Sequence, residues 1–170
     1  MKLRNLCIKD AKYMLEWMHD EDVVKDLKTD FSKKDIKDCE RFITESNRTN
    51  DNCHFAIVND FDEYMGTVSL KNITESTAEF GIAIRKCAMG KGYSKSAMEE
   101  TIQYGLEKLG LNCIYWCVDP INSRAVKFYD KNCYSRLCIS NNVDLLKKIR
   151  EIGGYTEEEI NHYIWYSVSK

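Results

Sequence analysis

Two side chains in this sequence can move protons at neutral pH, and both lie near features that could accommodate a ligand. Glu79 stands in a β-prone run whose alternation puts it on one face with Gly81 and Ala83, two very small residues that leave room beside the backbone. Tyr129 has an unperturbed pKa near ~10, so its hydroxyl can protonate a thiolate at neutral pH. The pair suits general acid–base catalysis. Taken singly, a solvent-facing carboxylate and an ordinary helix tyrosine explain the two residues as well.

A glycine-rich stretch joins the run that holds Glu79 to a helix-like pattern. Gly90 and Gly92 let the backbone turn sharply and approach a ligand closely. Unpaired N–H groups at the start of the following helix, together with its dipole, favour an anion such as pyrophosphate. The residues of this stretch are Met89, Gly90, Lys91, Gly92, Tyr93, Ser94 and Lys95. A G-x-G pair alone is usually no more than a turn, so this signal is weak by itself.

The glycine pattern does not match two well-known nucleotide-binding motifs. The dinucleotide-binding fingerprint needs a third glycine where this chain has Lys95, and a phosphate-binding loop of the form G-x-x-x-x-G-K is missing. A nucleotide-binding Rossmann domain and an NTPase are therefore disfavoured. Further along, Asn122 and Ser123 can cap a short helix that runs through Tyr129, or the Asn122 amide can contact a cofactor.

The cysteines and histidines indicate no metal or nucleophile. Eight cysteines without a C-x-x-C motif are best explained as reduced thiols, so no zinc site is expected. Cys113 and Cys117 would share a strand face with Tyr115 as small core residues. A covalent route through either thiol has little support, because no histidine is near them in the sequence. The histidines are interpreted as structural or surface residues: His19, His54 and His162.

The elements that must position these residues follow from hydrophobic periodicity. A strand over 3–8 precedes two helices, the first capped by Asp10 and the second by Ser32 with Asp35. The acidic stretch between them, 20–30, has no firm pattern. Three strands joined by short turns then predict an antiparallel meander. These strands cover 53–58, 65–70 and 78–85.

The second half alternates helices and strands. A helix over 92–109, ended by Gly110, leads to a strand over 113–118, with enough residues for a parallel crossover. The remaining elements are a helix through Tyr129, strands over 134–139 and 163–168, and a helix near 143–152 between those strands.

Composition is that of a globular protein, with 44% hydrophobic and 31% charged residues in a chain of 170. This length predicts a single domain over residues 1–170. The net charge of −2 lacks the basic excess of a nucleic-acid binder. No apolar run approaches the roughly 18–20 residues that cross a bilayer, and the N-terminus lacks a signal peptide's apolar stretch. We therefore expect a cytoplasmic protein without nucleic-acid or membrane partners.

Several segments occur in a characteristic order and spacing between Glu79 and Tyr134. They are Ala78-Glu79-Phe80-Gly81-Ile82-Ala83-Ile84, Gly90-Lys91-Gly92-Tyr93, Leu109-Gly110-Leu111, Ile114-Tyr115, Val118-Asp119, Asn122-Ser123-Arg124-Ala125 and Phe128-Tyr129-Asp130-Lys131. Together they resemble the GNAT superfamily of Gcn5-related N-acetyltransferases, nearest the branch of ribosomal-protein N-terminal acetyltransferases and spermidine acetyltransferases. The resemblance extends over nearly the whole chain.

The resemblance implies an α+β fold whose mostly antiparallel mixed sheet carries helices on both faces and splays into a V between the strands at 78–85 and 113–118. Acetyl-CoA, the implied co-substrate, would lie in that V, and no metal is implied. Its pantetheine would pair with the backbone near 82–84 and its pyrophosphate would bind at 90–94. The contacts assigned in this way include Ile82, Ala83 and Ile84 on the first strand, and Asn122 and Lys131 on the other side. Dimers are common among similar proteins, and the sequence leaves a homodimer open among the oligomeric states.

Two departures from the family pattern concern the loops. Cys87 stands where the family often has Gln or Arg three residues before the first glycine, and Cys133 stands where a Lys-x-Gly-Phe turn has glycine. The helix near 143–152 is longer than usual, which predicts a different acceptor pocket.

The expected reaction is direct acetyl transfer from acetyl-CoA to a primary amine in a ternary complex. Glu79 would take a proton from the acceptor ammonium, directly or through water, and Tyr129 would protonate the departing CoA thiolate. A polyamine, a peptide N-terminus, an aminoglycoside and an amino sugar all remain open as acceptors. The acidic stretch favours a cationic amine held by Asp22 and Asp26. The alternative is a non-catalytic acyl-CoA-binding or regulatory module with the same fold.

Overall fold

The computed structural model describes residues 1–46 and 50–170. The strands are β1 (Lys2–Asn5), β2 (Cys53–Val58), β3 (Tyr64–Lys71), β4 (Thr77–Ile84), β5 (Cys113–Val118), β6 (Ser135–Leu137) and β7 (Ile164–Ser169). The helices are α1 (Ala11–Met18), α2 (Glu21–Val24), α3 (Ile36–Ser46), α4 (Tyr93–Gln103), α5 (Ser123–Lys131), α6 (Val143–Ile152) and α7 (Glu157–His162). Within this described part of the chain, none of the helices combines the length and apolarity that a bilayer span needs.

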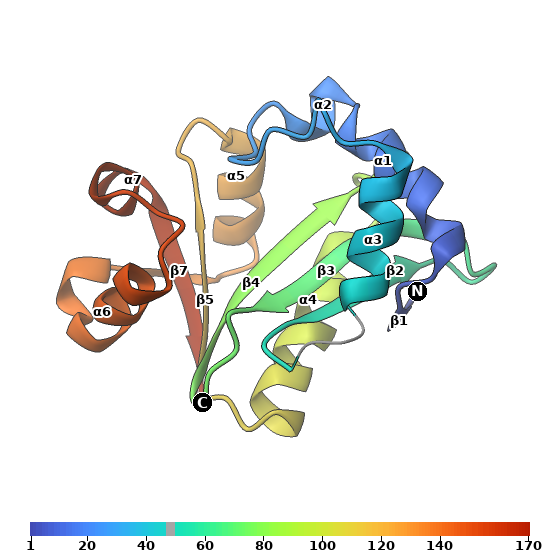
Figure 1. The fold of residues 1–170 in the computed structure, drawn as a ribbon. Coiled ribbons are helices and arrows are strands. Elements are labelled where there is room, and N and C mark those ends of the chain that lie inside the picture. Colours follow the sequence, from blue (N-terminus) through green and yellow to red (C-terminus); the bar gives the residue numbers. More distant parts are fainter. Residues whose placement is uncertain (47–49) are drawn as a thin grey trace.

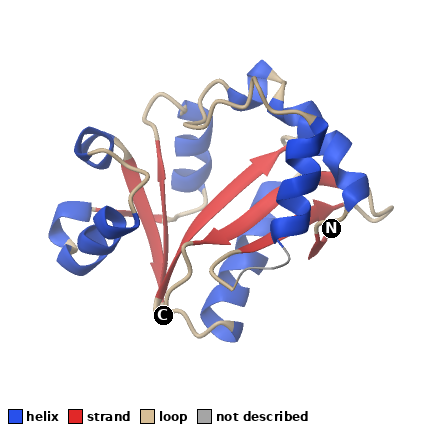
Figure 2. Ribbon diagram, in the orientation of Figure 1, coloured by secondary structure: helices blue, strands red, loops and turns tan. Residues whose placement is uncertain are grey.

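Within the described residues, the strands form one mixed sheet of seven in the order β1-β2-β3-β4-β5-β7-β6. Every neighbouring pair is antiparallel except β4 and β5, which run parallel. The parallel pair results from the crossover through α4, as the helix between these strands predicts. Helices cover both faces of the sheet (Figure 2).

The parallel pairing is short. Residues 77–79 of β4 pair with residues 113–115 of β5, and no further pairs follow among the described residues. Beyond this point β4 stays hydrogen-bonded to β3 as far as Ile84, and β5 stays bonded to β7 as far as Val118. Because each strand follows its own outer neighbour, the two separate toward their carboxyl ends (Figure 1). The expected V between these strands is confirmed.

The hydrophobic core divides between the two sheet faces, here called the α4 face and the α3 face. On the α4 face, Phe80, Met98 and Trp116 belong to a cluster that includes residues of α4 and α5. On the α3 face, one cluster joins α1 and α3 to β2 and a separate one joins α6 and α7 to β5. Tyr115 belongs to the latter, which agrees with the expected core face of β5.

Several helix starts differ from the sequence predictions. The cap of α3 is a reciprocal pair, in which the Asp38 amide donates to Asp35 Oδ1 over 2.9 Å and the Asp35 amide donates to Asp38 Oδ2 over 3.1 Å. Ser32 takes no part in this pair. Helix α7 was not expected, although Thr156 and Glu159 form the capping box that a T-x-x-E pattern predicts. The residues between 20 and 30 do include a short helix, α2.

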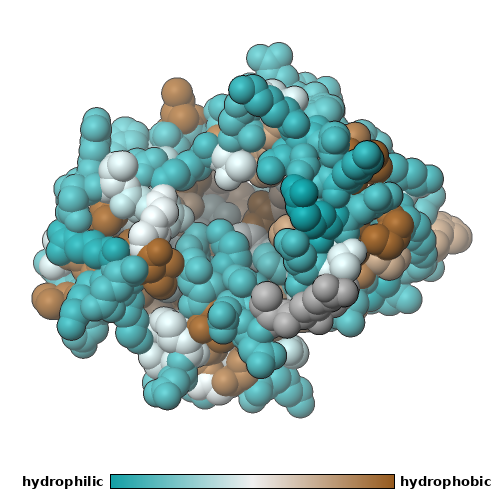
Figure 3. All heavy atoms as spheres, in the orientation of Figure 1, coloured by the Kyte–Doolittle hydropathy of each residue, from teal (hydrophilic) through white to brown (hydrophobic). Residues whose placement is uncertain are grey.

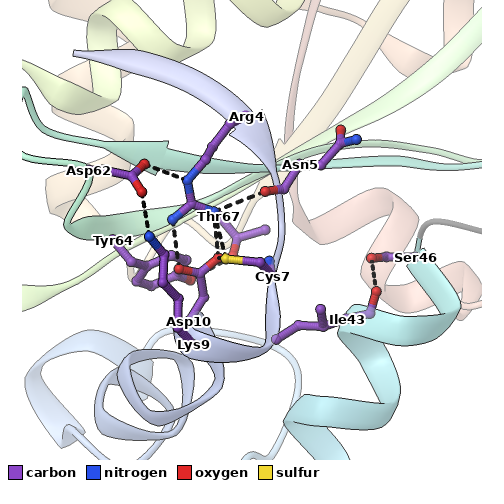
Figure 4. A network of polar contacts seen from close by, with 10 residues as sticks. All are labelled: Arg4, Asn5, Cys7, Lys9, Asp10, Ile43, Ser46, Asp62, Tyr64 and Thr67. Atoms are coloured by element: carbon purple, nitrogen blue, oxygen red, sulfur yellow. Dashed lines mark hydrogen bonds and ion pairs between the residues drawn. The ribbon is translucent and has the colours of Figure 1, made fainter.

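Asp10 does not cap α1 with its side chain. Its carboxylate is 1% exposed and accepts hydrogen bonds from Arg4 Nη1 over 2.7 Å and Arg4 Nη2 over 2.8 Å. The Cys7 amide donates a third over 2.9 Å. The prediction failed because a cap motif reports only local partners, whereas the guanidinium comes from β1 (Figure 4).

The same arginine reaches the turn between β2 and β3. Arg4 Nε donates to Asp62 Oδ1 over 2.7 Å, and Lys9 also bonds to the Asp62 carboxylate. Figure 4 shows Arg4 between the two carboxylates. This network ties the edge strand, the turn and the start of α1 together, and thereby holds the N-terminal helices on the α3 face.

Loss of the buried carboxylate should destabilise this corner. We expect Asp10→Ala to lower the free energy of unfolding by about 3 kcal/mol, because it leaves the guanidinium without its bidentate partner. Urea denaturation followed by circular dichroism measures the change. Asp60→Ala is the matched control: Asp60 pairs with the N-terminus but its side chain is 88% exposed, so stability should be unchanged. Equal stability of the two variants would contradict a structural role for the network.

Candidate active site

A cleft of about 920 Å³ opens where β4 and β5 separate. Its walls come from the carboxyl-terminal halves of both strands, the start of α5, the segment between α2 and α3, and the chain around Tyr155. In the space-filling view a hollow is visible between hydrophilic flanks (Figure 3). The splayed strands therefore build a concave site at the place that the sequence predicted for the ligand.

One wall is the edge of β4. Ile82, Ala83 and Ile84 line the cleft, as predicted. On this edge β4 has no strand partner beyond Glu79 among the described residues, since its pairing with β5 has ended. Peptide groups that face the gap are consequently available to an extended ligand that pairs as a strand would.

The glycine-rich turn adjoins this edge. Gly90 and Gly92 have φ angles of 74° and 85°, a left-handed conformation that disfavours other residues. Within the described part of the chain, the amides of Tyr93, Ser94 and Lys95 at the start of α4 have no hydrogen-bond acceptor. Such free amides at the positive end of a helix can bind a phosphate group.

The side chains of this turn divide into two groups. Met89, Gly90 and Ser94 line the cleft. The other predicted contacts lie outside the lining of the described cleft: Lys91, Gly92 and Lys95 are exposed, and Tyr93 is half-buried. A pyrophosphate bound on the amides would lie at this outer edge, within reach of lysines.

On the opposite wall, Asn122 fulfils the cap prediction. Its Oδ1 accepts from the Ala125 amide over 3.1 Å at the start of α5, and the residue lines the cleft. The second reading, a contact to a cofactor, stays open for its amide nitrogen, which has no partner among the described residues. Lys131 is exposed at the other end of α5 and does not line the described cleft.

Tyr129 lies on α5 in an aromatic cluster on the α4 face. Its ring centroid is 5.4 Å from that of Trp116 and 5.1 Å from that of Tyr166, and the residue is 8% exposed. Burial raises the pKa of Tyr129 above its ordinary value, so the hydroxyl remains a proton donor. Its hydroxyl has no hydrogen-bond partner within the described residues, and Tyr129 lines the cleft. It is therefore free to donate to a ligand there.

The turn after α5 keeps its geometry despite the cysteine. Cys133 has a φ of 61°, in the left-handed region where the family pattern has glycine. Tyr134 supplies the expected aromatic ring, whose centroid lies 5.3 Å from that of Trp116.

Glu79 is buried on the α3 face, with 7% of its surface exposed, and it lines the cleft. Its Oε1 accepts from Lys71 Nζ over 2.9 Å and from the Tyr155 hydroxyl over 2.9 Å. Its Oε2 accepts from Asn72 Nδ2 over 3.1 Å. The interpretation of Glu79 as a solvent-facing charge is therefore wrong: this is a buried carboxylate with three donors.

Sequence analysis did not identify these three donors. Lys71 pairs directly with Glu79 in the β3–β4 register, so a correct register would have found it. A side chain at Gly81 would contact Lys71 Cε at 3.4 Å, so the small residue leaves a path for the lysine. Tyr155 is 76 residues away from Glu79 along the chain, and no local pattern connects them.

Asp22 and Asp26, the two residues predicted to contact the amine substrate, differ in position. Asp26 lines the cleft. Asp22 is exposed and lies outside the described lining; it pairs with Lys86 Nζ over 2.6 Å, and this lysine lowers the pKa of Asp22. The Asp22 carboxylate is thus already paired with a lysine of the same chain, outside the cleft lining.

Two further groups in the cleft are electrically neutral at neutral pH. Burial raises the pKa of the Cys117 thiol to about 12, so it is protonated and a poor nucleophile. Burial also lowers the pKa of His54 to about 4, and its Nδ1 lies 2.7 Å from Ser69 Oγ. His54 lines the cleft, and its contact with Ser69 is compatible with the structural role that was predicted.

A family model described as an acetyltransferase (GNAT) domain matches residues 1–132. This is well over half of the chain, so the protein belongs to the GNAT family and is an N-acetyltransferase. The resemblance inferred from the sequence is confirmed, as are the fold and the enzymatic class.

Relatives of known name agree. The acetyltransferase PseH of Campylobacter jejuni subsp. jejuni serotype O:23/36 (strain 81-176) is 25% identical over 138 residues, which cover 79% of this chain and 85% of that protein. The structure of spermidine N-acetyltransferase from Vibrio cholerae in complex with CoA and spermine superposes with a TM-score of 0.72 at 21% identity, covering 80% and 81% of the two chains. Campylobacter jejuni PseH in complex with acetyl coenzyme A gives a TM-score of 0.66 at 20% identity, covering 99% and 98%. At these identities the structural matches establish the fold.

Protonation of His54 should make stability pH dependent. The folded-state pKa of about 4 lies below the ordinary 6.5, so the contribution of this residue is complete above pH 6.5 and is lost as the pH falls toward 4. We expect the free energy of unfolding to drop by at most about 3 kcal/mol across this window. Solvent screening of the partly exposed imidazole ring makes the drop smaller than this limit.

Urea titrations near pH 7 and near pH 4.5 measure this drop. His54→Gln should remove most of it, whereas His162→Gln, on the exposed face of α7, should retain it. An undiminished drop in His54→Gln would assign the pH dependence to other groups.

Proposed function

We propose that residues 1–170 form one domain that transfers the acetyl group of acetyl-CoA to a primary amine by direct attack in a ternary complex, with Glu79 as general base and Tyr129 as general acid. The observation that carries this proposal is that a buried carboxylate and a buried, protonated phenol border the same cleft, at the splayed ends of β4 and β5. They approach it from opposite faces of the sheet.

Acetyl-CoA supplies the acetyl group as a thioester. The residues present fit it: the open edge of β4 at Ile82, Ala83 and Ile84 suits an extended pantetheine, and the free amides at the start of α4 suit the pyrophosphate. Lys91 and Lys95 add positive charge beside those amides. Asn122 can donate its amide from the opposite wall. Lys131 retains its proposed contact to the outer part of the ligand.

In the proposed reaction, Glu79 accepts a proton from the acceptor amine and Tyr129 donates a proton to the leaving thiolate. An acceptor ammonium must lose a proton before its nitrogen lone pair can attack the acetyl carbon, and the Glu79 carboxylate can accept that proton. As the C–N bond forms and the C–S bond breaks, the thiolate takes the proton that Tyr129 holds. The high pKa of the Cys117 thiol argues against an acetyl-cysteine route.

The rival function is a non-catalytic acyl-CoA-binding or regulatory module. It would keep the cleft but would not need a proton donor and a proton acceptor in it. Free thiol release from acetyl-CoA, measured against a panel of polyamines, peptides, aminoglycosides and amino sugars, separates the two. Tight binding of acetyl-CoA in calorimetry without release for any amine would favour the module.

Substitution of the two catalytic groups should abolish most turnover. We expect Glu79→Gln and Tyr129→Phe each to lower kcat by about 10²- to 10⁴-fold, because each removes one proton-transfer partner. The KM for acetyl-CoA should change little, since both variants preserve side-chain shape. Tyr13→Phe, on α1, serves as the tyrosine control and should retain wild-type rates. A Tyr129→Phe enzyme with full kcat would reject its role as acid.

For the acceptor we favour a cationic amine with Asp26 at the rim as its second contact, since Asp26 lines the cleft while Lys86 occupies Asp22. Asp26→Asn should raise the KM for a polyamine about three- to tenfold, the size expected for one half-buried charge pair, with kcat retained. Asp22→Asn is its matched control and should leave the KM unchanged. The opposite pattern, or no change in either variant, would remove the acidic rim from the acceptor site.

The proposal also includes the cellular compartment and the oligomeric state of the protein. All eight cysteines are free, which is typical of a reducing compartment and supports a cytoplasmic enzyme. A homodimer stays a prediction, which light scattering on the purified protein can check.

A further inference from the structure

We propose that Tyr155 is a positioning residue for acetyl transfer, which holds the Glu79 carboxylate so that a single acceptor position, on Oε2, is open to the incoming amine. The inference rests on the proposed role of Glu79 and adds to it a residue from the segment between α6 and α7. Neither the sequence motifs nor the family resemblance assigns any function to this tyrosine.

The hydrogen bonds of Glu79 can be counted. An ionised carboxylate offers about four acceptor positions, two on each oxygen. Lys71 Nζ and the Tyr155 hydroxyl occupy those of Oε1, each at 2.9 Å. Asn72 Nδ2 occupies one on Oε2 at 3.1 Å. Within the described residues one position on Oε2 remains, and it is the one that an acceptor ammonium can use.

The direction of the Tyr155 hydrogen bond is set by its neighbours. The Cys117 thiol lies nearby, and burial raises the pKa of both the thiol and the Tyr155 hydroxyl. Both are therefore protonated at neutral pH. Because a carboxylate oxygen can only accept, the hydroxyl donates to Oε1. The tyrosine is thus a fixed donor toward the carboxylate.

The backbone turn before Tyr155 directs its side chain toward Glu79. Helix α6 ends at Gly153, and Gly153 and Gly154 have φ angles of 76° and 90°, which turn the chain back over the sheet. The Tyr155 ring then packs edge-on against Trp165, with the centroids 5.5 Å apart. This packing leaves the ring little freedom, which is what a positioning role requires.

A lysine from the other side of the cleft holds the same ring. Lys28, between α2 and α3, places Nζ 4.5 Å from the centroid of Tyr155 and donates to Glu159 Oε2 over 2.7 Å and to the Gly154 carbonyl. The segment between α2 and α3 thus contacts the segment between α6 and α7 at Tyr155. The titratable and charged groups around its ring and hydroxyl are Lys28, Lys71, Glu79, Cys117, Glu159 and Tyr163.

Tyr155→Phe removes the hydroxyl and keeps the ring. We expect kcat to fall about tenfold, with the KM for acetyl-CoA unchanged, because the carboxylate loses one of its two Oε1 donors. The acidic limb of the kcat/KM profile should move to higher pH, since a carboxylate with fewer donors takes up a proton more readily. Tyr104→Phe, on the α4 face, is the matched control and should alter neither quantity.

A double-mutant cycle separates positioning from general structural support. In the Glu79→Gln background, Tyr155→Phe should cause no further loss of kcat, because the tyrosine acts through the carboxylate. Gly154→Ala, strained at its φ of 90°, displaces the ring while keeping the hydroxyl and should shift the pH profile in the same direction. This variant decides the matter if Tyr155→Phe fails to fold.

Two results would overturn the proposal. One is a Tyr155→Phe enzyme with wild-type kcat and pH profile while Glu79→Gln is inactive, which would reject positioning alone. The other is an equal loss of kcat from Tyr155→Phe with and without Glu79, which would indicate general destabilisation. A Glu79→Gln enzyme with full activity is a different outcome, because it would reject the proposed function itself.

Discussion

The short parallel pairing of β4 with β5 creates the site, because each strand is held more firmly on its outer side. Three residues of each strand pair, and then β4 follows β3 while β5 follows β7. Strand twist turns this divergence into a gap. An unpaired strand edge inside a folded domain is normally avoided, since its peptide groups lose hydrogen bonds. Here the exposed edge is the surface on which we propose that acetyl-CoA binds.

The gap also brings together groups that the sheet would otherwise keep apart. Tyr129 belongs to the aromatic cluster on the α4 face, whereas Glu79 faces the chain around Tyr155 on the α3 face. In a continuous sheet the two side chains would be separated by backbone. Where the strands part, both border one cleft. The proposed proton donor and the proposed proton acceptor can then act on one ligand from two sides.

Two ion pairs balance charge in and beside the cleft. Lys71 accompanies Glu79, and Lys28 accompanies Glu159. A buried carboxylate without donors would be costly, and the three donors to Glu79 offset that cost while leaving part of one oxygen open. The proposed general base is consequently held in place by three donors that have no proposed part in proton transfer.

The sequence by itself determined the order of the strands and of the helices other than α2 and α7, the glycine turn before α4, the cap of α5 at Asn122 and the family. These features depend on neighbours a few residues apart, so periodicity and short motifs report them. Only the tertiary structure decided the rest: that Asp10 binds Arg4 instead of capping α1, that Lys86 occupies Asp22, and that Tyr155 reaches Glu79. Lys86 and Asp22 are 64 residues apart and Tyr155 and Glu79 are 76 apart, while Arg4 reaches Asp10 from a separate element six residues away. Sheet register and packing choose these partners, and no local pattern encodes them.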